Sequence, residues 1–190
     1  MATLGGRHPG LLNANDVGLL IVDLQEGFRP VIDHFDETAR NCRILVEGFA
    51  ILDAPIIVSE QYPKGLGHTV PEVAEVLPEG TPVVEKMQFS VVGVEGLDAA
   101  IAGAWRTRWV VCGIESHVCV NQSVYDLIAL GHDVFIAADA VSSRSPANRK
   151  VGLEKCAYAG AVVTSTETVL FEMLGHAGSD AFKAISKLVR

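Results

Sequence analysis

Cys119 stands at the start of an expected helix, shortly after an apolar run that ends in Gly113. A cysteine in this position suits a nucleophile, because the free N–H groups and the positive dipole end of a helix stabilise its thiolate and lower its pKa. The N–H groups of the turn between Gly113 and Cys119 also suit an oxyanion hole for a tetrahedral intermediate. The spacing therefore predicts a nucleophilic cysteine for acyl transfer.

Two charged residues, Asp23 and Lys86, follow other expected strands, at residues 17–22 and 82–85. The carboxyl ends of parallel strands meet at one edge of a sheet, so we expect both side chains to lie near Cys119. There Asp23 would take and return the thiol proton, and Lys86 would hold the carboxylate in place. The ordinary alternatives are a turn aspartate, a solvent-facing lysine and a cysteine that serves as a small core residue.

The elements that would position these residues alternate between strands and helices. Short apolar runs predict strands at residues 17–22, 55–59, 82–85, 109–112, 133–138 and 161–164. Helical spacing predicts helices at residues 37–53, 97–104, 119–131, 146–160, 167–174 and 179–189. A long loop over residues 60–80 would hold one helical turn at 73–76. This alternation predicts a three-layer, Rossmann-like α/β fold with a mostly parallel sheet of about six strands flanked by helices.

Length and composition narrow the class of protein. The 190 residues are expected to form one domain, 1–190, with residues 1–15 as a surface lead-in. The net charge of −8 and the scattered Lys and Arg residues argue against binding to nucleic acid. The apolar runs have the length of strands, so no membrane span is expected. The N-terminus has no apolar segment of the kind found in secretory signals.

The four cysteines show no CxxC spacing, which argues against a zinc knuckle or a disulfide framework and favours a reducing, cytoplasmic setting. Three of them are expected to be buried and inert, namely Cys42, Cys112 and Cys156. The polar stretch from Asp139 to Arg144 is interpreted as a structural turn, because Asp and Ser side chains readily bond nearby N–H groups.

Five longer motifs stand at residues 21–28, 60–67, 85–90, 112–119 and 139–145. Together they resemble the isochorismatase-like cysteine hydrolase superfamily, which includes nicotinamidases, and most closely its short isochorismatase domain-containing proteins. The resemblance extends from Leu19 to about residue 188. It implies a catalytic triad of Asp23, Lys86 and Cys119.

The resemblance also implies a cis peptide between Ile114 and Glu115, with the N–H groups of Glu115 and Cys119 forming the oxyanion hole. Members of this family usually assemble, so a homo-oligomer, a dimer or a tetramer, is expected. Glu115 and His117 would then lie near a neighbouring subunit. Five residues on loops beside the triad strands are candidates for substrate contact: Phe28, Gln61, Tyr62, Phe89 and His117. For Phe28 and Phe89 the alternative is packing in the core.

Nicotinamidases carry a metal-binding Asp-x-His motif after the second strand, whereas this chain has Ser59, Glu60 and Gln61 at the matching place. A lone Glu60 with the distant His68 is a poor ligand set. We therefore expect no metal and no other cofactor, and the difference argues against nicotinamidase activity.

These observations predict a metal-independent cysteine hydrolase that cleaves a small amide or a related C–N bond through a thioester on Cys119. Two alternatives remain. One is a catalytically idle homologue that acts as a binding or scaffold protein. The other is a thiol redox or sensing protein that uses Cys119, although no cysteine nearby in sequence is placed to resolve a sulfenic acid and only Cys112 could be close in space.

Overall fold

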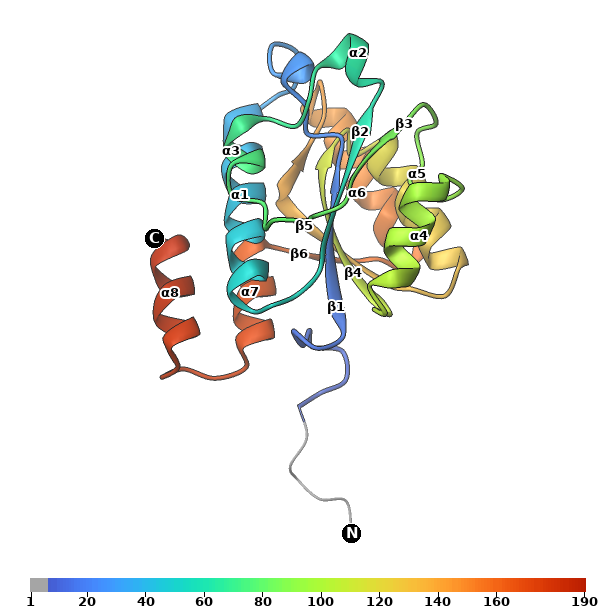
Figure 1. The fold of residues 1–190 in the computed structure, drawn as a ribbon. Coiled ribbons are helices and arrows are strands. Elements are labelled where there is room, and N and C mark those ends of the chain that lie inside the picture. Colours follow the sequence, from blue (N-terminus) through green and yellow to red (C-terminus); the bar gives the residue numbers. More distant parts are fainter. Residues whose placement is uncertain (1–6) are drawn as a thin grey trace.

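The fold was analysed in a computed structural model that describes residues 7–190 (Figure 1). Its centre is one sheet of six strands, all parallel, in the order β3-β2-β1-β4-β5-β6. The strands are β1 (Val17–Val22), β2 (Ile56–Gln61), β3 (Val83–Lys86), β4 (Arg108–Ile114), β5 (Asp133–Ser142) and β6 (Val162–Thr164). The predicted α/β fold and six-stranded sheet are confirmed.

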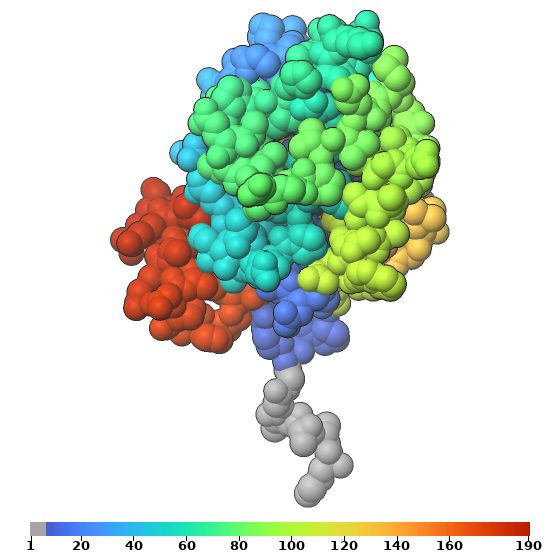
Figure 2. Space-filling view, viewed as in Figure 1, coloured from blue at the N-terminus to red at the C-terminus, as the bar shows by residue number. Residues whose placement is uncertain are grey.

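Helices cover both faces of this sheet, which gives three layers. One face packs against α1 (Phe35–Ile51), α3 (Pro71–Ala74), α7 (Thr166–Leu174) and α8 (Asp180–Leu188). The other packs against α4 (Glu95–Gly103), α5 (Cys119–Ala129) and α6 (Pro146–Ala159). Two short elements, a 3-10 turn at Glu26–Phe28 and α2 (Pro63–Leu66), complete the set. In the space-filling view, α7 and α8 form the red lobe beside α1 (Figure 2).

The central strand β1 is buried along its whole length, and its side chains alternate between the two cores. Leu19 and Ile21 belong to the cluster on the α1 side, while Leu20 and Val22 belong to the cluster on the α5 side. This period of two is the geometry of an extended strand. A strand that must be apolar on both faces carries chemistry only where it ends.

Gly113 brings the ends of β1 and β4 together. It has a φ of +106°, and a Cβ built there would lie 2.0 Å from the carbonyl oxygen of Val22. No residue with a side chain fits this contact. The turn after β4 therefore lies directly beside the residue that follows β1.

The sequence-based prediction was wrong over two segments. β5 continues to Ser142, so Asp139 lies in a strand and not in a turn. Its polar side chain is satisfied there because Oδ1 accepts hydrogen bonds from Thr166 N at 2.8 Å and Thr166 Oγ1 at 3.0 Å. Gln61, predicted on a loop, is the last residue of β2. The loop that follows contains α2, which had not been predicted.

The predicted lead-in is only partly a surface segment. Residues 7–15 contain no helix or strand, but Leu12 is fully buried in the core on the α1 side. Leu12 N also donates to Glu172 Oε2 at 3.1 Å, which ties the segment to α7. Residues 1–6 lie outside the described residues. Among residues 7–190, no helix combines the length and apolar character needed to cross a membrane.

Candidate active site

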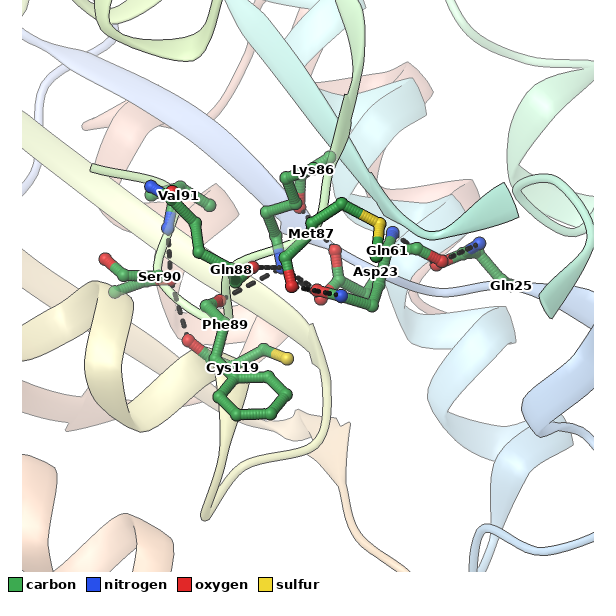
Figure 3. A network of polar contacts seen from close by, with 12 residues as sticks. Asp23, Gln25, Gln61, Lys86, Met87, Gln88, Phe89, Ser90, Val91 and Cys119 are labelled. Atoms are coloured by element: carbon green, nitrogen blue, oxygen red, sulfur yellow. Dashed lines mark hydrogen bonds and ion pairs between the residues drawn. The ribbon is translucent and has the colours of Figure 1, made fainter. Parts of the chain in front are cut away.

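The side chains of Asp23 and Lys86 meet at the carboxyl edge of the sheet, beside Cys119 at the start of α5 (Figure 3). Lys86 Nζ donates to Asp23 Oδ2 at 2.6 Å, and both side chains are fully buried. The other carboxylate oxygen, Oδ1, accepts a hydrogen bond from Ser59 Oγ at 2.7 Å. Ser59 was not predicted as a site residue, although its place at the end of a strand next to β1 was the available signal.

Lys86 Nζ is surrounded by oxygen atoms. Besides Asp23 it donates to Gln61 Oε1 at 2.9 Å and to the carbonyl oxygens of Phe89 at 3.0 Å and Gln88 at 3.2 Å. An ammonium group has only three protons, so its hydrogen-bonding capacity is used up here. The side chain is therefore held against Asp23 and is not open to solvent.

Gln61, a candidate for substrate contact, belongs to this framework. Its Oε1 accepts from Lys86, and its Nε2 donates to the carbonyl oxygen of Met87 at 2.8 Å. Its backbone is held by Gln25, whose Oε1 accepts from Gln61 N at 2.7 Å and whose Nε2 donates to Gln61 O at 3.0 Å. The amide of Gln61 thus orients Lys86, and Gln25 was a positioning residue that sequence reasoning did not identify.

Electrostatics at the site differ from the sequence-based expectation for the thiol. Burial and the charge of Asp23 raise the pKa of Cys119 to about 12, although Lys86 acts in the opposite direction. The expected lowering was wrong, because Cys119 is only 6% exposed and its burial is the largest influence on its pKa. The resting group is a thiol.

Burial also raises the pKa of Asp23, although the charge of Lys86 and hydrogen bonds, among them the one from Ser59, act to lower it. A carboxylate with a raised pKa is a stronger base than one in water. A weakly acidic thiol therefore lies next to a carboxylate suited to receive its proton.

The turn between β4 and α5 presents two N–H groups. The peptide bond between Ile114 and Glu115 is cis. The carbonyl oxygen of Glu115 accepts from Val118 N at 3.0 Å and from Val120 N at 3.2 Å. Within residues 7–190, the N–H groups of Glu115 and Cys119 donate to no acceptor.

The other candidates for substrate contact differ in how far they are exposed. Phe28 is half-buried against the core on the α1 side, whereas Tyr62 and Phe89 are each about half exposed. A cavity of about 460 Å³ lies beside Lys86 and has Tyr62 on its wall. His117 is partly buried, and its Nδ1 lies 3.0 Å from Ser143 Oγ.

Both carboxylate oxygens of Glu60 have hydrogen-bond partners within the chain. Its Oε1 accepts from Thr69 N at 2.6 Å and Thr69 Oγ1 at 2.7 Å, and its Oε2 lies 2.9 Å from His68 Nδ1. Burial opposes the charge, but these bonds outweigh it and hold the pKa of Glu60 below its ordinary value. In the described part of the chain, no three His, Cys, Asp or Glu side chains cluster in a way that could hold a metal ion.

All four cysteines are free and buried. Cys112 belongs to the core on the α1 side, where Cys42 is its thiol neighbour, whereas Cys119 belongs to the core on the α5 side. The sheet therefore separates Cys112 from Cys119, so the two thiols are not close in space as a redox role would need.

Comparison with known proteins agrees with this geometry. The Isochorismatase domain matches residues 17–168, which is most of the chain. The chain belongs to the isochorismatase family. The predicted resemblance is thereby confirmed, and membership of this family supports a hydrolase.

Two curated family members illustrate the similarity. Isochorismatase domain-containing protein 1 of Danio rerio is 41% identical over 169 residues, covering 88% of this chain and 59% of that protein. The chain thus spans about three-fifths of the length of that relative. Isochorismatase domain-containing protein 2 of Danio rerio is 38% identical over 181 residues, covering 95% of this chain and 90% of that protein.

Solved structures of the isochorismatase fold superimpose closely. The MAR1 ribonuclease of Caenorhabditis elegans has a TM-score of 0.89 and 38% identity, covering 94% of this chain and 92% of that one. The YcaC gene product of Escherichia coli, described as an octameric hydrolase of unknown specificity, has a TM-score of 0.84 and 22% identity, covering 90% of this chain and 85% of that one. The latter likeness concerns the fold alone.

Proposed function

We propose that this protein is a metal-independent cysteine hydrolase that cleaves a small amide or a related C–N bond through a thioester on Cys119. One observation carries the proposal. A fully buried Asp23–Lys86 pair lies beside a buried thiol, next to two N–H groups that have no acceptor within residues 7–190. A buried ion pair is often no more stabilising than apolar residues of similar volume, so its presence at this edge of the sheet supports a chemical role.

In the first half of the reaction, Asp23 takes the proton of Cys119 as the sulfur attacks the substrate carbonyl carbon. The N–H groups of Glu115 and Cys119 stabilise the oxyanion of the tetrahedral intermediate. Asp23 then protonates the departing nitrogen, the C–N bond breaks and a thioester remains on Cys119. Burial and the charge of Asp23 raise the pKa of Cys119, which supports removal of its proton during the attack.

In the second half, Asp23 takes a proton from water as the water oxygen attacks the thioester. The same N–H groups hold the second oxyanion, the C–S bond breaks, and Asp23 returns the proton to the sulfur. Lys86 stays bound to Asp23 throughout and keeps the carboxylate aimed at the thiol. No metal or cofactor is needed for either half.

The first test uses 4-nitrophenyl acetate, an activated ester that acylates a nucleophilic thiol without demanding a specific substrate. The wild type should release a burst of about one 4-nitrophenolate per chain and should carry an acetyl group on Cys119 by mass spectrometry. Cys119→Ser and Asp23→Asn should lose the burst. Cys42→Ala, which removes a buried thiol from the core on the other face of the sheet, is the matched control and should keep it. Small amides can then be screened by ammonia release.

The other functions make different predictions. A folded wild-type protein without a burst would favour the catalytically idle homologue. A redox role for Cys119 is disfavoured because redox-active cysteines are exposed and have a low pKa, whereas this one is buried with a raised pKa. A ribonuclease, the activity for which the Caenorhabditis elegans protein is named, would cleave RNA, and Cys119→Ser would show whether the same site does so. The net charge of −8 speaks against that activity.

We further propose a homo-oligomer, a dimer or a tetramer, in the cytoplasm. The YcaC gene product, which shares the fold, is described as octameric. Four unpaired cysteines support a reducing compartment. Light scattering of the purified protein tests the first statement, and cell fractionation tests the second.

A further inference from the structure

The last residue of β5 and the two residues after it contact the turn before α5. Ser116 N donates to the carbonyl oxygen of Ser142 at 2.8 Å. Arg144 donates twice to Glu115 Oε2, from its backbone N at 2.9 Å and from Nε at 3.1 Å. Two segments that are distant in sequence are thus joined by both backbone and side-chain bonds, right next to the candidate oxyanion hole.

Ser143 is the centre of this contact. Its side chain is fully buried, and its Oγ lies 2.6 Å from Ser116 Oγ and 3.0 Å from His117 Nδ1. One hydroxyl therefore binds two consecutive residues of the turn. A buried hydroxyl with two partners fixes their positions, since loss of either bond leaves a buried polar atom unpaired.

The segment that contacts the turn, residues 142–144, is also hydrogen-bonded to Asp33. Ser142 Oγ donates to the carbonyl oxygen of Asp33 at 2.5 Å, and Asp33 N donates to the carbonyl oxygen of Ser143 at 3.0 Å. On the α6 side, Gly152 packs so closely that a Cβ there would lie 2.5 Å from the backbone of Ser116. The turn before α5 is therefore packed between the segment after β5 and helix α6.

We propose that Ser143 and Arg144 are positioning residues that hold the N–H groups of Glu115 and Cys119 in converging directions. This inference rests on the proposed function of that site. Neither residue needs to touch the substrate. They act through the turn, because Arg144 binds Glu115 and Ser143 binds Ser116 and His117. Misplacement of a reacting group by about 1 Å can cost about 100-fold in rate, so such bonds matter for catalysis.

The test compares two reactions of the same sulfur. Acylation by 4-nitrophenyl acetate passes through an oxyanion, whereas methyl methanethiosulfonate has no carbonyl: the thiolate attacks its sulfur, an S–S bond forms and methanesulfinate leaves. Ser143→Ala should slow acylation of Cys119 about 10- to 100-fold, up to the cost of misplacing a reacting group by about 1 Å. The rate with methyl methanethiosulfonate should stay within about threefold of the wild type. A merely structural role would change both rates together.

Two further variants keep the test decisive. The side chain of Arg144 is 61% exposed, so Arg144→Met does not threaten the fold and should lower the ratio of the two rates in the same direction. Thr38→Val removes a buried hydroxyl on α1, bonded to the carbonyl oxygen of His34, and should leave the ratio unchanged. If the wild type is acylated, but Ser143→Ala and Arg144→Met have the wild-type ratio of the acylation rate to the rate with methyl methanethiosulfonate, this inference is wrong. If the wild type is not acylated, the proposed function fails, and this inference fails with it.

Discussion

Replacement of Lys86 by methionine is expected to destabilise the protein strongly. The substitution keeps most of the apolar stem but removes the ammonium group, which donates to Asp23 at 2.6 Å and to three further oxygens. Asp23 would remain fully buried, with the hydroxyl of Ser59 and the thiol of Cys119 as its side-chain donors and no cation beside it. Removing one partner of a buried ion pair costs about 3–5 kcal/mol, since the other charge is left uncompensated.

The assay is thermal unfolding. For a chain of this size, 1 kcal/mol corresponds to about 2–4 °C, so Lys86→Met should lower the Tm by about 6–20 °C near pH 8. The difference in Tm between Lys86→Met and the wild type should become smaller as the pH is lowered. Lys86 lowers the pKa of Asp23, so its loss raises that pKa further above the unfolded value. A raised folded pKa contributes stability that is present at low pH and lost as the pH rises.

The double variant Asp23→Asn/Lys86→Met supplies the control, because it removes both charges. It should recover a large part of the lost Tm and should show little dependence on pH. A Tm for Lys86→Met within about 2 °C of the wild type would refute the reasoning, since that corresponds to about 1 kcal/mol or less. An equal lowering of the Tm by Lys86→Met at pH 5 and at pH 8 would also refute the reasoning.

Two other predictions concern the thiol and the packing behind the turn. With the pKa of Cys119 raised to about 12, its rate with methyl methanethiosulfonate should rise about tenfold per pH unit from pH 7 to pH 10. A plateau below pH 9 would contradict this. Gly152→Ala should cost about 1–3 kcal/mol in urea unfolding, because its Cβ would meet the backbone of Ser116 at 2.5 Å. Gly103→Ala, with no atom within 4 Å of the new Cβ, is the matched control and should unfold no more easily.

Much of the fold could be predicted from local patterns. The run at residues 17–22 and the helix start at Ser145 and Pro146 depend only on neighbouring residues, and both appear as expected. Ser145 Oγ accepts from Asn148 N at 3.2 Å, as a helix N-cap should. Errors arose where a polar residue is satisfied by a distant partner, as Asp139 is by Thr166.

The sequence by itself determined which chemistry-bearing residues meet. Asp23 and Lys86 each come at the end of a parallel strand and Cys119 begins the helix after another, so the topology alone brings them to one edge of the sheet. Residue types and motifs also determined the family. Such statements depend on order along the chain, which the sequence contains in full.

Only the tertiary structure decided the properties that depend on contacts between distant segments. The pKa of Cys119 was predicted to fall because its helix position is visible in the sequence, whereas the burial that raises it is not. Gln61 was expected to face substrate, yet its amide is bound to Lys86 and Met87. The grip of Ser143 on the turn before α5 joins residues more than twenty positions apart. Burial and hydrogen-bond partners are properties of the packed chain, so they could be known only after the elements were assembled.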